Sequence, residues 1–165
     1  MKSVIIREMK EEDWTRVAQI YQMGIDSNKA TFVTECPSYE SWDQAHVKSC
    51  RYVAVVDDTI AGFVALSPTS TRELYRGVVE VSIYLDDAYQ NQGIGKMLML
   101  KVIEASEAEG FWTIYSSIFV ENEGSRRLHE SCGFRLIGKR EMIAKDRYGI
   151  WRDTVIYERR SKVII

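Results

Sequence analysis

The feature that most constrains the fold of this chain is a glycine-bearing turn between a strand pattern and a helix pattern. The strand pattern is residues 78–85 (VVEVSIYL), and the turn is residues 90–96 (QNQGIGK). Apolar side chains then recur at helical spacing to about Glu109, where Gly110 is typical of a helix end. The first N–H groups of a helix lack partners within the helix and attract negative charge, and glycine lets a bulky anion approach the backbone. The sequence therefore predicts a turn that binds a phosphorylated ligand.

Two common phosphate loops do not fit this turn. A P-loop has Ser or Thr after its Gly-Lys pair, whereas Met97 follows Lys96, and no glycine lies five residues before Gly95. A dinucleotide-binding loop has a third glycine where this chain has Leu98. Nucleotide hydrolases and dehydrogenases are therefore disfavoured. The pattern that remains is Q-x-x-G-x-G, and an ordinary tight turn between a strand and a helix stays an alternative.

Length and composition favour one globular domain over residues 1–165. The chain has 165 residues, 45% of them hydrophobic and 28% charged, which is ordinary for a soluble protein with a real core. The net charge of −2 does not favour a nucleic-acid partner, and neither a membrane span nor a signal peptide is expected. Cys36, Cys50 and Cys132 lack the spacing of metal ligands. We therefore expect no metal, and interpret these residues as reduced thiols of a cytoplasmic protein.

Hydrophobic periodicity and capping signals predict the order βααβββαβαββ in one mixed sheet. Ser38 is expected to cap a second helix that runs through Cys50, and Asp57-Asp58-Thr59 to form a hairpin turn. The expected strands are residues 4–9, 52–57, 60–66, 78–85, 112–120, 134–144 and 150–159, and the expected helices are about 13–25, 39–50, 94–109 and 122–132.

Two residues are candidates for acid–base chemistry. Alternation along residues 78–85 places Glu80 on the strand face opposite four aliphatic side chains, where a carboxylate is costly unless it is paired or lines a cavity. A salt-bridged or surface Glu80 is the plain alternative. Asn122, Ser125 or Arg126, and His129 share one face of the short helix. An imidazole exchanges protons near neutral pH, although a lone His is as often a surface or satisfied core residue.

With this order in place, the chain resembles the GNAT acyltransferase superfamily over nearly its full length, most closely the phosphinothricin and methionine sulfoximine/sulfone N-acetyltransferase branch. The resemblance implies a single, mixed, mostly antiparallel central sheet flanked by about four helices, in the α/β (α+β) class. It implies acetyl-CoA as the co-substrate and a homodimer. The segments that carry it are Ile6-Arg7-Glu8, Ala30-Thr31-Phe32, Glu35-Cys36-Pro37, residues 79–84, the Q-x-x-G-x-G turn, Asn122-Glu123-Gly124-Ser125, Leu128-His129-Glu130, Gly133-Phe134 and residues 146–153.

The resemblance also implies roles for individual residues in acetyl transfer. Glu80 would take a proton from the ammonium group, directly or through water, and His129 would support the leaving thiolate by donating a proton. The backbone of Ile83, Tyr84 and Leu85 would pair with the pantetheine arm and stabilise the oxyanion, while Asn122 would bind the pantetheine and Ser131 would lie near the coenzyme. The pyrophosphate would be held by Asn91, Gln92, Gly93, Ile94, Gly95 and Lys96, although Lys96 is equally interpreted as a solvated lysine.

For the acceptor, the resemblance implies a small amino acid analogue with a carboxylate. Arg72 and Tyr75 would line its pocket, and Phe32 and Glu35 would lie in a covering loop. Relatives often carry a second basic residue where this chain has Ser70, so methionine sulfone or sulfoximine is favoured over the dianionic phosphinothricin. Two alternatives stay open: an acetyltransferase of protein or peptide N-termini, and a coenzyme-A-binding module without catalysis. No nucleic-acid or membrane partner is expected.

Overall fold

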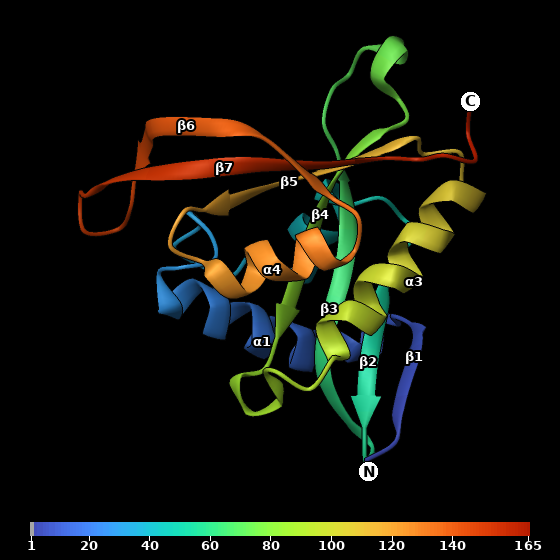
Figure 1. Cartoon of the computed structure of the whole chain (residues 1–165). Coiled ribbons are helices and arrows are strands. Elements are labelled where there is room, and N and C mark those ends of the chain that lie inside the picture. Colours follow the sequence, from blue (N-terminus) through green and yellow to red (C-terminus); the bar gives the residue numbers. More distant parts are fainter. Residues whose placement is uncertain (1) are drawn as a thin grey trace.

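The computed structural model describes residues 2–165 and has the predicted order of elements (Figure 1). The strands are β1 (Val4–Glu8), β2 (Tyr52–Val56), β3 (Thr59–Pro68), β4 (Val78–Leu85), β5 (Thr113–Phe119), β6 (Arg135–Lys145) and β7 (Trp151–Arg160). The helices are α1 (Trp14–Ser27), α2 (Tyr39–Ala45), α3 (Ile94–Ala108) and α4 (Glu123–Ser131). The expected fold class is confirmed.

One seven-stranded sheet runs through the molecule in the order β1-β2-β3-β4-β5-β7-β6. Every neighbouring pair is antiparallel except β4 and β5, which are parallel at the centre. A parallel neighbour requires a crossover, and α3 supplies it between β4 and β5. The turn predicted to bind phosphate therefore lies at the centre of the sheet.

Alternation along the strands creates two cores on opposite faces of the sheet. On one face, Val79 and Val81 of β4 pack with Leu98 and Val102 of α3. On the other, Phe63 of β3 packs with residues of α1 and α2 such as Val17, Ile20 and Trp42. Since β2 and β3 bury apolar side chains on both faces, polar side chains near the centre of the sheet need a local reason.

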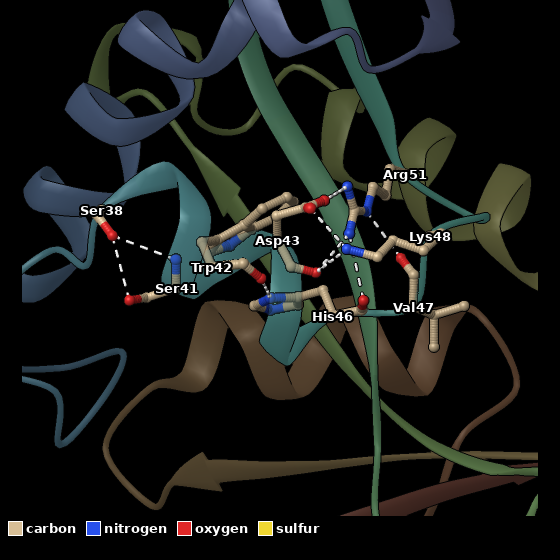
Figure 2. Close-up of polar contacts among 8 residues, drawn as sticks. All are labelled: Ser38, Ser41, Trp42, Asp43, His46, Val47, Lys48 and Arg51. Carbon is tan, nitrogen blue, oxygen red and sulfur yellow. Dashed lines mark hydrogen bonds and ion pairs between the residues drawn. The ribbon is translucent and has the colours of Figure 1, made fainter.

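The second helix is shorter than the sequence predicts. Ser38 caps it as expected, since its Oγ accepts a hydrogen bond from the N–H of Ser41, but the helix ends at Ala45 instead of continuing to Cys50. The reason is the side chain of His46, whose Nδ1 lies 2.7 Å from the carbonyl oxygen of Trp42 (Figure 2). In a continuing helix that carbonyl would accept the backbone N–H of residue 46. The His46 ring occupies this carbonyl oxygen instead, and the backbone of His46 is extended.

No helix among residues 2–165 is both long enough and apolar enough to cross a bilayer.

Candidate active site

The central pair of strands separates halfway along its length. β4 and β5 pair only from Val78–Thr113 to Glu80–Tyr115. Beyond that point β4 stays with β3 to Leu85 and β5 stays with β7 to Phe119, so each half of the sheet remains intact while the two diverge. The backbone edge of β4 that faces the gap has no strand partner over residues 81–85. A separation of this kind opens a space in the middle of a domain.

A cavity of about 390 Å³ occupies the gap. Its lining comes from both diverging strands, the loop after α1, the end of α2, α4 and β7. The lining residues are Tyr21, Ala30, Thr31, Phe32, Val33, His46, Ser67, Glu80, Val81, Ser82, Ile83, Tyr84, Ser116, Ser117, Ile118, Phe119, Asn122, Ser125, His129 and Thr154. Glu80 is the only Asp, Glu, Lys or Arg in this lining, so the cavity suits a cationic or neutral group.

Glu80 lies at the point where the strands part. It is half-buried, and its Oε2 accepts a hydrogen bond of 3.0 Å from the hydroxyl of Tyr115 on β5. Burial, followed by the charge of Glu80, raises the pKa of Tyr115 to about 12, so this hydroxyl remains a donor at neutral pH. Glu80 makes no salt bridge within residues 2–165, which removes the salt-bridged alternative for this residue, and its Oε1 makes no hydrogen bond there.

His129 is almost completely buried, with 1% of its surface exposed. Its Nδ1 lies 2.7 Å from the carbonyl oxygen of Ser125, and because a carbonyl only accepts, Nδ1 carries the proton. Burial lowers the pKa of His129, so the neutral ring presents the lone pair of Nε2. That atom and Oγ1 of Thr154 are buried without hydrogen-bond partners among residues 2–165. Both residues line the cavity, and buried polar atoms without partners there suit a polar ligand or water.

A smaller groove of about 240 Å³ continues from the cavity toward the turn before α3. Ala30, Ile83, Tyr84, Asn122 and Ser125 line both spaces. The remaining lining of the groove is Met23, Gly24, Ser27, Lys29, Leu85, Asp87, Gln90, Gly124 and Leu128. The cavity and the groove together form a path from Glu80 to the predicted turn.

The predicted turn has the backbone of an anion site. Gly93 precedes α3 with a φ of +79°, and no side chain caps the helix, so the N–H groups of its first turn are available. Gly95 also has a packing role. A Cβ there would lie 3.2 Å from Leu128 and 3.4 Å from Leu85, so this glycine permits close packing of α3.

A polar network holds the loop that covers the cavity. Phe32 of this loop packs edge-on against Phe119 with ring centroids 4.7 Å apart. The guanidinium of Arg152 lies 4.3 Å from the Phe119 ring, donates to the carbonyl oxygen of Asn28, and pairs with Asp146 at 3.1 Å. The Asn28 amide and further hydrogen bonds lower the pKa of Asp146 to about 2, so it stays ionised. The β6–β7 hairpin therefore positions the covering loop.

The structure brings together only part of the predicted site. Glu80, His129, Phe32, Ile83 and Tyr84 line the cavity, Leu85 lines the groove and Asn122 lines both. Asn122 also donates to the carbonyl oxygen of Lys29 across the path, at 3.1 Å. The predicted residues that line neither space are Glu35, Arg72, Tyr75, Asn91, Gln92, Gly93, Ile94, Gly95, Lys96 and Ser131.

Three of these residues, Glu35, Arg72 and Tyr75, were predicted for the acceptor site. Glu35 is exposed in the loop after α1. Arg72 and Tyr75 stack on one another at 5.4 Å in an exposed segment between β3 and β4. This segment projects beyond the end of the sheet (Figure 1). Among residues 2–165, no Lys or Arg side chain lines the cavity to bind a carboxylate. His46 and Thr154 also line the cavity, and no sequence pattern indicates this, because their positions depend on contacts between distant segments.

No group of three or more His, Cys, Asp or Glu side chains suited to a metal ion occurs among residues 2–165. The cavity and groove suit an extended organic ligand, and the uncapped first turn of α3 suits a phosphorylated end.

Comparison with known proteins agrees with this geometry. A model of the acetyltransferase (GNAT) family matches residues 10–134. The phosphinothricin N-acetyltransferase of Streptomyces viridochromogenes is 29% identical over 162 residues, covering 96% of this chain and 88% of that protein. An L-methionine sulfoximine/L-methionine sulfone acetyltransferase of Pseudomonas aeruginosa is 25% identical, covering 92% of this chain and 91% of that protein.

Among solved structures, a phosphinothricin acetyltransferase from Sinorhizobium meliloti in complex with AcCoA aligns with a TM-score of 0.86 and 25% identity. The alignment covers 95% of this chain and 88% of that one. These similarities confirm the resemblance inferred from the sequence motifs. The chain belongs to the acetyltransferase (GNAT) family.

Proposed function

We propose that this protein transfers the acetyl group of acetyl-CoA to the α-amine of a small amino acid analogue of the methionine sulfone, methionine sulfoximine or phosphinothricin type. The observation that carries the proposal is Glu80, the only charged side chain of a cavity that opens where β4 and β5 part. A carboxylate in that position attracts an ammonium group and is placed to take its proton. The named relatives support the class of acceptor.

The residues along the path fit acetyl-CoA as the co-substrate, which supplies the activated acyl group as a thioester. The open edge of β4 at residues 81–85 suits the amides of pantetheine, since an added strand pairs with such an edge. Asn122 lies along the same path. The uncapped N-terminus of α3 suits the pyrophosphate. We assign the oxyanion donor to a backbone N–H of Ile83, Tyr84 or Leu85.

We propose that Glu80 takes the first proton, which converts the ammonium group to a nucleophilic amine. When the amine adds to the thioester carbonyl, its nitrogen again carries a surplus proton, and the departing sulfur needs one. A neutral His129 can accept that proton at Nε2 and return it to the sulfur. The resemblance implied that His129 donates a proton to the sulfur from the start. Here His129 first accepts a proton from the amine, because burial favours the unprotonated ring before reaction. The bond from nitrogen to carbon forms and the carbon–sulfur bond breaks without a proton from solvent.

The cavity favours an acceptor whose side chain is uncharged. Its lining offers Phe32, aliphatic side chains and serine hydroxyls, with no cation for a phosphinate. We therefore place methionine sulfone and sulfoximine ahead of phosphinothricin, and assign the acceptor carboxylate to the open side of the cavity. Arg72 is then the candidate partner if its exposed segment folds inward when substrate binds.

We also propose a cytoplasmic homodimer that forms through β6 and β7. This hairpin exposes a set of apolar side chains, namely Leu136, Ile137, Met142, Ile143, Ile150 and Trp151. Light scattering of the purified protein tests the assembly, and a monomer at micromolar concentration would contradict it.

A thiol-release assay with acetyl-CoA tests the function. The panel is methionine sulfone, methionine sulfoximine, phosphinothricin, ordinary amino acids and short peptides. Glu80→Gln is expected to lower kcat by about 100-fold or more, the usual contribution of a positioned base. The matched control is Glu104→Gln on the exposed face of α3, which should leave kcat unchanged. Turnover of peptides alone would replace the proposed acceptor with a protein N-terminus, and coenzyme binding without turnover would indicate a non-catalytic module.

A further inference from the structure

The chain contains two histidines, and both line the cavity that holds Glu80. His129 belongs to the proposed chemistry, but His46 has no part in it. His46 lies just past the end of α2, on the opposite side of the sheet from α4. Its presence in the same cavity is a property of the fold, since no sequence pattern connects these two residues.

The ring of His46 is fixed in one orientation. Its Nδ1 lies 2.7 Å from the carbonyl oxygen of Trp42, so Nδ1 carries the proton that forms this hydrogen bond. One face of the ring stacks on the indole of Trp42, with centroids 4.3 Å apart and planes 24° apart. Trp42 is itself buried in the core. Rotation of the imidazole would break the hydrogen bond and the stack together.

The backbone beneath His46 is also fixed (Figure 2). Arg51 donates to the carboxylate of Asp43 at 2.6 Å, to the carbonyl oxygen of Val47 at 2.8 Å and to that of His46 at 3.2 Å. Lys48 donates to the same carboxylate at 2.6 Å. These contacts satisfy the carbonyl groups at the end of α2 and hold the segment against β2 and β3. The ring is therefore positioned before any ligand arrives.

The remaining polar atom of the ring, Nε2, makes no hydrogen bond within residues 2–165. Unlike Nε2 of His129, this atom is not fully buried, and His46 lines the cavity. Burial, with the nearby charge of Arg51, lowers the pKa of His46, and the neutral ring offers a lone pair there. Capping of α2 uses Nδ1 alone and does not require that Nε2 face a cavity.

We propose that His46 is a substrate-binding residue of the acceptor site, and that its Nε2 accepts a hydrogen bond from the acceptor amine beside the carboxylate of Glu80. The inference rests on the function proposed above and adds which groups hold the amine. An amine or ammonium group carries several N–H donors, so it can satisfy Glu80 and His46 at once. A carboxylate has no donor, and both acceptors would repel it. The pair therefore fixes which end of an amino acid enters the cavity.

Two substitutions separate this role from a structural one. His46→Phe keeps an aromatic ring for the stack on Trp42 and removes Nε2, whereas His46→Gln keeps a polar group that can accept. We expect His46→Phe to raise KM for the amine about tenfold, the effect of one lost hydrogen bond. KM for acetyl-CoA should stay within about twofold, and His46→Gln should recover part of the loss. If KM for the amine stays within about twofold in His46→Phe, the proposal is wrong.

Nitrogen-15 NMR of the imidazole rings supplies a readout that needs no turnover. Because the chain has two histidines, His46→Gln assigns both sets of signals even if His46→Phe fails to fold. Methionine sulfone added to the native protein with saturating coenzyme A, which carries no acetyl group, should shift the Nε2 signal of His46 and leave its Nδ1 protonated. Acetylation of the sulfone without this shift would overturn the inference and keep the function. Absence of turnover with every amine would refute the function, and an unmoved His46 signal would then refute the inference as well.

Discussion

Substitution of Gly24 by alanine tests whether the ring of Tyr84 sets the shape of the path through the protein. Gly24 lies in α1 where this helix crosses β4, and a Cβ there would lie 2.6 Å from Cδ1 and 2.7 Å from Cε1 of Tyr84. The Tyr84 ring packs against two neighbouring rings. Its centroid lies 5.0 Å from that of Tyr21 and 5.4 Å from that of Phe63, and those two rings are 6.3 Å apart, so the three form one cluster. Since Tyr84 borders both the cavity and the groove, any shift of its ring changes both.

The magnitude follows from two opposing effects. Carbon atoms in contact normally lie about 3.5–4.0 Å apart, so the ring must move by roughly 1 Å. Overpacking of this kind costs about 1–3 kcal/mol, whereas replacing glycine by alanine within a helix gains up to about 1 kcal/mol. Gly124→Ala isolates the second effect, because a Cβ at Gly124 in α4 meets nothing within 4 Å. For a chain of this size each kcal/mol shifts Tm by about 2–4 °C, so Gly24→Ala should melt about 5 °C below Gly124→Ala.

Thermal melts of both variants and steady-state kinetics of Gly24→Ala check the reasoning. We expect KM to rise several-fold for the amine and for acetyl-CoA, because one ring borders both binding spaces. Gly124 also borders the groove, so this variant is a control for stability alone. If Gly24→Ala melts at or above the control with both KM values unchanged, the ring has room to move and the account of Tyr84 is wrong.

Three further substitutions test the polar groups. Burial lowers the folded-state pKa of His129, so near and below the ordinary value of about 6.5 the unfolded chain binds more protons than the folded chain. The free energy of unfolding should therefore fall as the pH drops from 7.5 to 5.5. Urea midpoints that fall equally in His129→Gln would contradict this. Tyr115→Phe removes the donor to Glu80 and should lower kcat about tenfold with little loss of stability; unchanged kcat would show that this hydrogen bond does not matter. Arg152→Met should raise KM for the amine and leave KM for acetyl-CoA unchanged, because the loop that packs on Phe119 loses its support; equal changes in both would point to general destabilisation.

The order of the elements could be predicted from the sequence because local physics determines it. Asp57 and Asp58 form the expected hairpin turn with φ angles of +47° and +64°, and Gly110 follows α3 with a φ of +85°. Ser38 and Asn122 cap α2 and α4 through their side chains. Each of these signals acts within four residues, so a single sequence contains all the information needed.

The site could be predicted only where it lies on one element. Alternation along β4 placed Glu80 on the face opposite the aliphatic core, and helical spacing related His129 to Ser125. The positions of Arg72 and Tyr75 depend on how an irregular segment folds, and there the expectation that they line the pocket finds no support within one chain. The predicted end of α2 was wrong for a similar reason. The ring of His46 donates to the carbonyl oxygen of Trp42 and replaces the backbone hydrogen bond that would continue the helix.

The location of the site follows from the pairing of the strands. The four strands β1 to β4 form one well-paired half of the sheet, and β5, β7 and β6 form the other, while only residues 78–80 and 113–115 join them. Beyond this short junction, the backbone edge of β4 lies inside the protein without a strand partner, which is costly unless a ligand or water pairs with it. A ligand that carries amides therefore recovers hydrogen bonds that the protein cannot make by itself. The same junction brings Glu80 from β4 and Tyr115 from β5 into contact, so the proposed base lies at the inner end of the edge proposed to bind the coenzyme.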